Sequence, residues 1–496
     1  MRKSALRAMT VVGLALTSNP LDAQAGLGQL EDATTPPGGF FRLRLINAWT
    51  RSDARFTANG VEPLGAPFTA DGFGADKFQP LTAIQSLVQA ASGLPVTLSL
   101  GRSRLDATYR EEILPLALEY GITRRLSVSV VMPVVRKRAA MLFRLDTAGG
   151  FSANVGPNLH RTSTLASQTN ATVQTQFDNA ATMLAALLAS CAGNPGGAGC
   201  ATLAGREAEA QQLIQSSQGF ASTVETLYGS ATSTGMAFVP TSASAAQQEI
   251  ALRVAAFNAQ YRDLLTSSTD LIVAVPRGAG GIAGAADFQS YLTEDLGRDS
   301  LTMQERIGIG DVELGFKFRV LDRPRTDQRR TGIQLALAGG VRLPTGSRQS
   351  TSDVVDLRLG EGSVVVDSRA IVDARAGRFG LLAAGHFATS VQNVDTTDAA
   401  TRTARWTEIH VAPRWHVSEP LAIHAAYSIR TTDKNGGDQL VGGGISFTSL
   451  SAFRGSGSPP VEMRFTHLEA VRGEAGKPKF FRDQLEVRIY YRLLGR

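Results

Sequence analysis

Apolar and polar residues alternate one by one over long stretches of this chain. Near the carboxyl end, Leu485, Val487, Ile489, Tyr491 and Leu493 interleave with Gln484, Glu486, Arg488, Tyr490 and Arg492. Further upstream, Val312, Leu314, Phe316 and Phe318 share one face, while Asp311, Glu313, Lys317 and Arg319 share the other. A period of two predicts β-strands with one apolar and one charged face.

The alternating segments are too long for an ordinary soluble sandwich, whose strands usually have about five or six residues. A tilted strand that crosses a bilayer needs about 9 to 11 residues. We expect strands near 40–50, 106–120, 125–143, 306–321, 331–346, 362–376, 379–391, 404–417, 419–431, 438–449, 460–471 and 482–494. About twelve antiparallel strands, an even number, predict an all-β transmembrane barrel.

The connections between these strands alternate in length. Those at 121–124, 376–379 and 417–420 are short, and those at 51–105, 144–305, 347–361 and 392–403 are long. Short periplasmic turns and long extracellular loops are typical of outer-membrane barrels. The links at 322–330 and 450–459 are longer than this pattern predicts.

Residues 1–25 have the organisation of a cleaved signal peptide, with an uncleaved anchor as the alternative. Arg2, Lys3 and Arg7 precede the apolar run 11–17, and Ala23-Gln24-Ala25 offers a small-residue cleavage site. No later apolar run is long enough for a spanning helix. With 496 residues, 43% of them hydrophobic and 19% charged, the chain can bury a large core. The net charge of +6 comes from arginines spread along the chain, so we expect no nucleic-acid partner.

The block 150–303 differs from the rest because its apolar residues recur at helical spacing. We expect a large, mainly α-helical insertion in an extracellular loop, which lies inside the barrel as a plug or outside it as a cap. The domains are then 1–25 (signal peptide), 26–149 (first barrel strands and loop), 150–303 (helical insertion) and 304–496 (remaining barrel strands). Cys191 and Cys200 flank a glycine-rich loop, and an oxidising compartment favours a disulfide between them over two free thiols.

Three motifs in the chain occur at strand ends and turns. They are the hairpin around Tyr120-Gly121-Ile122-Thr123, extending to Pro133, the strand Gly308-Ile309-Gly310-Asp311, and the strand end Leu343-Pro344-Thr345-Gly346. Together they resemble an outer-membrane family that is labelled for the MetA-pathway of phenol degradation and grouped with hydrophobic-compound channels. The resemblance covers about 106–135 and 306–346, and residues 150–303 have no counterpart in it. It implies an outer-membrane barrel that transports aromatic or apolar compounds. The chain departs from many such barrels by ending in Leu493-Leu494-Gly495-Arg496 rather than in an aromatic residue.

The charged faces of the strands are the candidate lumen. The polar residues that we expect to face it are Asp311, Glu313, Lys317, Arg319, Arg342, Asp367, Arg369, Glu408, His410, Arg414, Glu486, Arg488 and Arg492. Their mixed signs suit a conduction path and a plug of salt bridges equally. We expect no metal site, because the spacings of Glu408, His410, His416 and His424 match no ligand motif. We also expect neither a cofactor nor enzymatic activity, since no nucleophile elbow is present.

These observations predict a passive channel or transporter for small hydrophobic or aromatic compounds, located in the cell outer membrane. The expected partners are outer-membrane lipid, such a solute, and the barrel-assembly machinery during biogenesis. The first alternative is a structural or surface-docking barrel whose helical insertion binds a partner without transport. The second alternative is an exported soluble β-protein.

Overall fold

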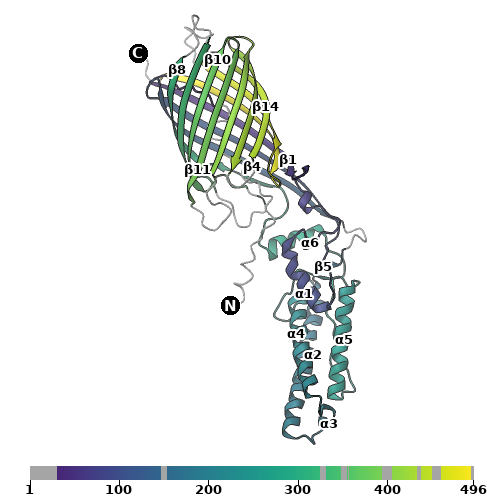
Figure 1. The fold of residues 1–496 in the computed structure, drawn as a ribbon. Coiled ribbons are helices and arrows are strands. Elements are labelled where there is room, and N and C mark those ends of the chain that lie inside the picture. The colour runs from purple at the N-terminus through teal and green to yellow at the C-terminus, as the bar shows by residue number, and fades with distance from the viewer. Residues whose placement is uncertain are drawn as a thin grey trace. The chain divides into compact units, whose positions relative to one another are not determined.

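The computed structural model describes residues 31–146, 153–323, 331–347, 355, 357–393, 405–432, 437–449 and 460–492. The expected signal peptide lies outside these residues. Most of the described chain forms one antiparallel sheet (Figure 1). Its strands are β1 (Phe40–Thr57), β2 (Gly60–Pro63), β3 (Ser103–Gly121), β4 (Leu126–Leu145), β7 (Gln304–Ile309), β8 (Val312–Arg323), β9 (Thr331–Leu343), β10 (Ser363–Ala376), β11 (Phe379–Asn393), β12 (Arg405–His416), β13 (Leu421–Thr432), β14 (Gly437–Thr448), β15 (Val461–Arg472) and β16 (Pro478–Arg492).

The sheet closes on itself because its last strand pairs with its first. β1 and β16 are in antiparallel register from Phe40 opposite Arg492 to Arg55 opposite Pro478. Within the described residues the sheet has fourteen strands, of which β2 is a short extension beside β1. β7 and β8 both pair with β4 and share one position around the wall. The result is the predicted twelve-stranded barrel, with strands in up-and-down order.

Burial alternates along the strands with the period that the sequence predicts. On β3, Ala107, Tyr109, Ile113 and Ala117 are buried, whereas Leu114, Leu116, Leu118 and Tyr120 are exposed. Similar exposed apolar side chains lie on the neighbouring strands, among them Leu45, Val128, Val130, Phe316, Leu337, Ile409, Ile423, Ile445 and Phe465. In a soluble protein this exposed surface would be unfavourable. On a closed barrel it is the surface that faces lipid.

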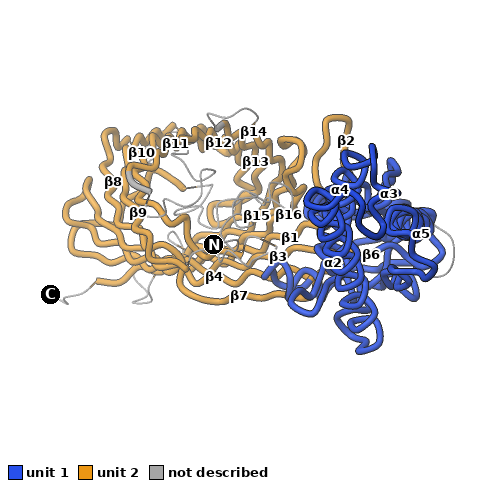
Figure 2. Tube along the Cα trace, turned by 90° about the horizontal axis from the view of Figure 1, so that it is seen from below, with its two compact units in different colours: residues 1–14, 66–105, 143–300 blue, residues 15–65, 106–142, 301–496 orange. Residues whose placement is uncertain are grey.

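The chain divides into two compact units (Figure 2). The barrel belongs to the second unit, and the first contains residues 66–105 and 143–300. The helices of the first unit are α1 (Thr82–Ser92), α2 (Thr164–Gly193), α3 (Cys200–Leu203), α4 (Glu207–Tyr228), α5 (Ala245–Leu265) and α6 (Ala285–Ser290). It also holds the short strands β5 (Val155–Pro157) and β6 (Phe238–Pro240). None of the helices in the described ranges has the length and apolar character needed to cross a bilayer.

The helical unit has an aromatic core of its own. Phe177 of α2, Phe220 of α4 and Phe257 of α5 pack with ring centroids 5.2–5.8 Å apart. Ser163 and Ser244 cap α2 and α5 by accepting hydrogen bonds from the backbone of the first helical turn. A disulfide joins Cys191 at the end of α2 to Cys200 at the start of α3. Residues 66–105, which the sequence assigned to the first barrel loop, contribute α1 to this unit.

Candidate functional site

The polar faces of the strands point into the lumen. Of the residues predicted to face it, Asp311, Glu313, Lys317, Arg342, Asp367, Glu408, His410, Glu486 and Arg488 are buried. The side chains of Arg319, Arg369 and Arg414 are mostly buried, at 13%, 9% and 16% exposure. Arg492 differs from them because it is exposed, with its guanidinium over the ring of Phe40. It is the last residue of β16 and pairs with Phe40 of β1.

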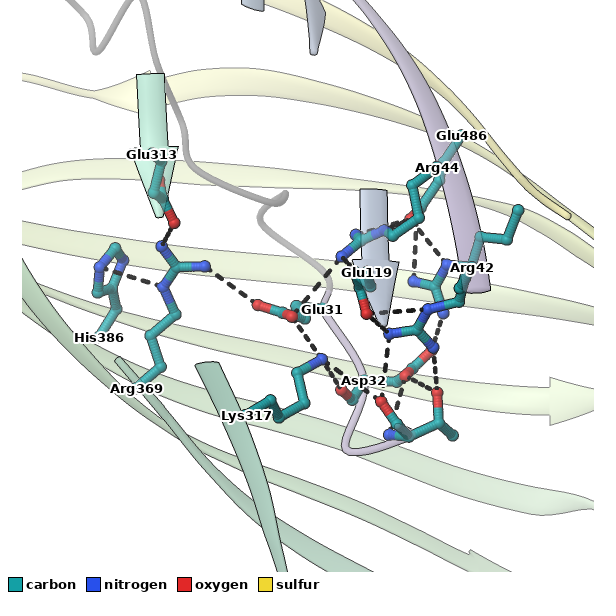
Figure 3. Close-up of polar contacts among 12 residues, drawn as sticks. Glu31, Asp32, Arg42, Arg44, Glu119, Glu313, Lys317, Arg369, His386 and Glu486 are labelled. Carbon is teal, nitrogen blue, oxygen red and sulfur yellow. Dashed lines mark hydrogen bonds and ion pairs between the residues drawn. The ribbon is translucent and has the colours of Figure 1, made fainter. Parts of the chain in front are cut away.

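A segment that precedes the first strand lies inside the ring of charged residues (Figure 3). The Glu31 carboxylate is 2.5 Å from the Lys317 Nζ of β8 and 3.1 Å from the Arg369 guanidinium of β10. It is also 3.6 Å from the Arg44 guanidinium of β1. These cations come from different sides of the barrel. Glu31 therefore lies in the lumen rather than on its wall.

Asp32 and Thr34 extend this anchoring. The Asp32 carboxylate pairs with Arg488 of β16 and lies 3.7 Å from Arg464 of β15. Arg42 donates to the Thr34 hydroxyl at 2.9 Å, and Lys317 donates to the Asp32 carbonyl at 3.2 Å. We call residues 31–37 the lumen segment.

The charge of the lumen segment is fixed by its surroundings. Burial by itself raises the pKa of the Glu31 carboxyl, but Lys317, Arg369 and Arg44 together hold that pKa below its usual value. For Asp32 the cations outweigh burial more strongly, since Arg488, Arg42, Lys317 and Arg464 hold its pKa well below the usual range. Both carboxylates are therefore ionised at neutral pH.

Hydrogen bonds to backbone carbonyls hold the carboxyl end of the lumen segment and the residues directly after it. These carbonyls lie at the end of the barrel that carries the short turns, which we call the short-turn end. Gly39 donates to the Gly121 carbonyl at 2.8 Å, and the Thr35 hydroxyl donates to the Arg124 carbonyl at 3.2 Å. A Cβ atom on Gly121 would lie 2.2 Å from the Pro37 carbonyl oxygen. This close approach explains why glycine follows Tyr120 in the hairpin motif.

On the wall, a chain of ion pairs connects the first and last strands. Glu119 of β3 binds Arg42 and lies 3.1 Å from Arg44. Arg44 in turn is 2.7 Å from Glu486 of β16, which also accepts from Arg488 at 2.7 Å. All five side chains are buried. Each charge therefore has an opposite partner, as burial of ions requires.

A second group lies across the lumen on β8 to β11. Arg369 is 2.7 Å from Glu313 and 3.0 Å from Asp367. His386 of β11 is 3.4 Å from Asp367. Arg342 is 2.7 Å from Glu361, a residue that follows β9. Through Arg369, this group and the lumen segment form one network (Figure 3).

The remaining predicted residues form small pairs. Glu408 accepts from the Ser428 hydroxyl at 2.9 Å and lies 3.1 Å from His410, while Arg414 pairs with Asp373 at 2.5 Å. His424 is 3.1 Å from the Thr466 hydroxyl. Among the described residues, no group of three or more His, Cys, Asp or Glu side chains is placed to hold a metal ion.

The motifs 308–311 and 343–346 lie in contact between the end of β7 and the start of β8. The Asp311 carboxylate accepts hydrogen bonds from the backbone of Gly346 at 2.8 Å and of Glu361 at 2.7 Å. Thr345 accepts from Val312 at 2.9 Å and donates to the Gly310 carbonyl at 3.0 Å. We call this arrangement the Asp311 clasp. It ties Gly346 and Glu361 to the wall.

The lumen also has an apolar stripe that the sequence analysis did not predict. It is a buried cluster formed mainly by inward side chains of β9 to β16, together with Ala33 of the lumen segment. Its members include Ala336, Ile371, Leu382, Ala412, Ala426, Leu440, Leu468 and Phe480. Beside Asp32 and Arg488, a polar cleft of about 150 Å³ remains open.

Sequence reasoning missed Glu31, Asp32 and Thr34, because they precede the first strand and follow no alternation. Glu119 could have been found, since it lies on the same face of β3 as the buried Ala117. The apolar stripe could not, because the alternation of apolar and polar residues predicts a polar interior.

The closed sheet, its apolar exterior and its charged lumen define a transmembrane β-barrel. No family model matches the chain, and no curated protein matches it either. Among solved structures it is similar to an outer membrane channel from Pseudomonas putida F1, at 11% identity and a TM-score of 0.38, over 93% of this chain and 98% of the other. It is also similar to the toluene transporter TodX of P. putida, at 9% identity and a TM-score of 0.27, over 94% of each chain. The toluene transporter TbuX of Ralstonia pickettii gives 10% identity and 0.26, over 93% and 91%.

Proposed function

We propose that the protein is an outer-membrane channel that admits small hydrophobic or aromatic compounds, and that its lumen is closed while the lumen segment is docked. The observation that carries this proposal is the combination of an apolar stripe with a segment held across the lumen by ion pairs. A barrel that served only as a rigid wall would not need a cluster of buried apolar side chains beside its charges.

The charged network supports closure rather than ion conduction. Lumen cations and anions neutralise each other in pairs, whereas an ion-selective pore has a ring of one sign at its constriction. The cleft that remains beside Asp32 is narrow and polar. With the segment docked, an apolar solute has no continuous path along the stripe.

Displacement of the segment opens that path. Ala33 covers part of the stripe, so its departure would expose Ala336, Ile371 and their neighbours to a solute. The segment is held by polar contacts to the walls and by the backbone contacts near Gly121. A local rearrangement of residues 31–37 therefore opens the lumen without unfolding the strands.

The test compares permeability of the full chain and of the E31Q/D32N variant in liposomes. Both substitutions keep side-chain size and remove the charge that binds Lys317, Arg369 and Arg488. We expect toluene uptake and single-channel conductance to rise several-fold in the variant. The matched control is D178N/E207Q, which removes two exposed carboxylates from α2 and α4 and should leave both quantities unchanged. Absence of permeability to any apolar or polar solute, in both the native chain and E31Q/D32N, would refute transport.

That result would favour the alternative function, a structural barrel whose helical unit binds a partner. The observation in its favour is the network of buried ion pairs that joins the lumen segment to the barrel wall. The same proposal includes export by residues 1–25, insertion by the barrel-assembly machinery and membership of the MetA-pathway family. Fractionation of the mature chain with outer-membrane vesicles tests its location in the outer membrane.

A further inference from the structure

On four neighbouring strands, the exposed residues of the outer face change from apolar to charged at the same height along the barrel. On β3, the exposed Leu118, Leu116 and Leu114 are followed by Glu112 and Arg110. On β4, Met132 and Val134 are followed by Arg136 and Arg138. On β1 the apolar residues end at Trp49, and on β16 the first charged residue of the outer face beyond them is Asp483. The apolar surface that faces lipid therefore ends here, at the end of the barrel opposite the short turns.

A groove lies at this boundary. It has a volume of about 760 Å³, and its lining includes Trp49, Arg51, Arg110, Arg136, Arg138 and Phe481. We call it the arginine groove. Trp49 and Phe481 are 39% and 38% exposed, and aromatic side chains of this kind mark the interface between hydrocarbon and headgroups in barrels.

The arrangement of its arginines is unfavourable for the isolated chain. Arg51 of β1 and Arg110 of β3 are direct cross-strand partners on the same face. Like charges directly opposite each other destabilise a sheet. Within the described residues, neither Arg110 nor Arg138 forms an ion pair. A bound anion would turn this repulsion into attraction.

The carboxylates of the groove do not supply the missing counter-charge. Asp53 is 3.9 Å from Arg51, both side chains being more than half exposed. Asp483 is bonded to His467 at 2.7 Å, and Arg136 is bonded to Glu305 at 2.9 Å. Glu112 lies opposite Trp49 in the strand register, and Glu111, which also lines the groove, is 3.4 Å from the Lys137 Nζ. Arg138 donates one hydrogen bond to the Met303 sulfur at 2.7 Å. Its other N–H groups and those of Arg110 remain as donors to a ligand.

We propose that the arginine groove binds the phosphate groups of an outer-leaflet lipid, whose acyl chains lie along the apolar surface below it. Guanidinium groups bind phosphate through paired N–H donors, and each basic residue near an anionic membrane surface adds to binding. The location at the edge of the apolar surface favours a lipid over a free anion, because acyl chains and phosphates are then held together. The proposal depends on membrane insertion and is independent of transport.

The experiment measures binding of diphosphorylated lipid A to the full chain in detergent, by the fluorescence of Trp49. A W49F variant identifies the Trp49 component of the signal, since the chain has two other tryptophans. We expect R51Q/R110Q/R138Q to bind lipid A about tenfold more weakly than the native chain, and added salt to reduce native binding. Phosphate-free lipid should bind both chains equally and weakly.

The matched control is R124Q/R125Q/R378Q, which removes three arginines from turns at the short-turn end and should leave lipid A binding unchanged. The gel mobility of the unboiled triple variant shows whether it is folded. If it is not folded, the single variants R110Q and R138Q replace it, and we expect each to bind lipid A about threefold more weakly than the native chain. Inorganic phosphate at millimolar concentration should not displace lipid A. The proposal would be overturned if the native chain and the groove variants bound lipid A equally, or if the control lost as much lipid A binding as the groove variants. Displacement of lipid A by inorganic phosphate alone would also overturn it.

Discussion

Arg488 has partners from both ends of the chain. It binds Asp32, which precedes the first strand, and Glu486, which lies two residues away on its own strand. It is 2% exposed. The attraction between buried ions offsets the cost of removing them from water only when every charge has a partner. The lumen network is therefore sensitive to loss of a single member.

Replacement of Arg488 by methionine tests this at the residue scale. R488M keeps much of the side-chain volume but leaves Asp32 and Glu486 short of a cation, so we expect a loss of about 3–5 kcal/mol in the free energy of unfolding. The measurement is the urea unfolding midpoint of the barrel in lipid vesicles. R492M removes an exposed arginine from the same strand and should change the free energy by no more than about 0.5 kcal/mol. Equal effects of the two substitutions would contradict the network.

Among the elements, the strands follow from sequence almost completely, because alternation sets both their positions and their faces. The expected strand at 379–391, for example, is β11 (Phe379–Asn393). The long helices α2, α4 and α5 follow from helical spacing in the same way. The lumen segment does not, since its position depends on cations that lie hundreds of residues away. The Asp311 clasp is also hidden, because the sequence shows its two motifs but not that they meet.

Substitution of Gly360, which lies beside the Asp311 carboxylate, tests the Asp311 clasp. A Cβ atom on Gly360 would lie 2.2 Å from the Asp311 carboxylate, so G360A should displace the loop at a cost of about 1–3 kcal/mol. We expect the amides of Gly346 and Glu361 to exchange hydrogen faster in this variant. G385A is the control, because a Cβ atom on Gly385 of β11 would meet nothing within 4 Å. Unchanged amide exchange in G360A would show that Asp311 does not hold the loop.

At the scale of the whole molecule, the helical unit is assembled from two separate stretches of chain. α1 packs against α4 and α5, and its Ile84 and Val88 are buried. Removal of 155–300 alone would therefore expose the apolar face of α1. Each of the two units is compact by itself, so we expect the barrel to fold without the helices.

Deletion of both stretches tests this independence. A variant in which short glycine-serine linkers replace 68–101 and 153–300 should fold into a barrel that migrates faster on a gel before boiling than after. A variant that lacks only 155–300 should aggregate during refolding, because α1 has lost its partners. If the double deletion fails to refold while the single deletion succeeds, the two units do not fold independently.

The pairing of Asp32 with Arg488 also sets an order of events during biogenesis. The two residues are 456 positions apart in sequence, and Arg44 and Glu486 are 442 apart. A nascent barrel without its last strand offers no Arg488 to the lumen segment, and β1 lacks the partner that pairs with it from Phe40 to Arg55. Docking of the segment can be complete only after β16 has joined β1. The seal across the lumen thus forms last, and a chain that stalls during insertion remains unsealed.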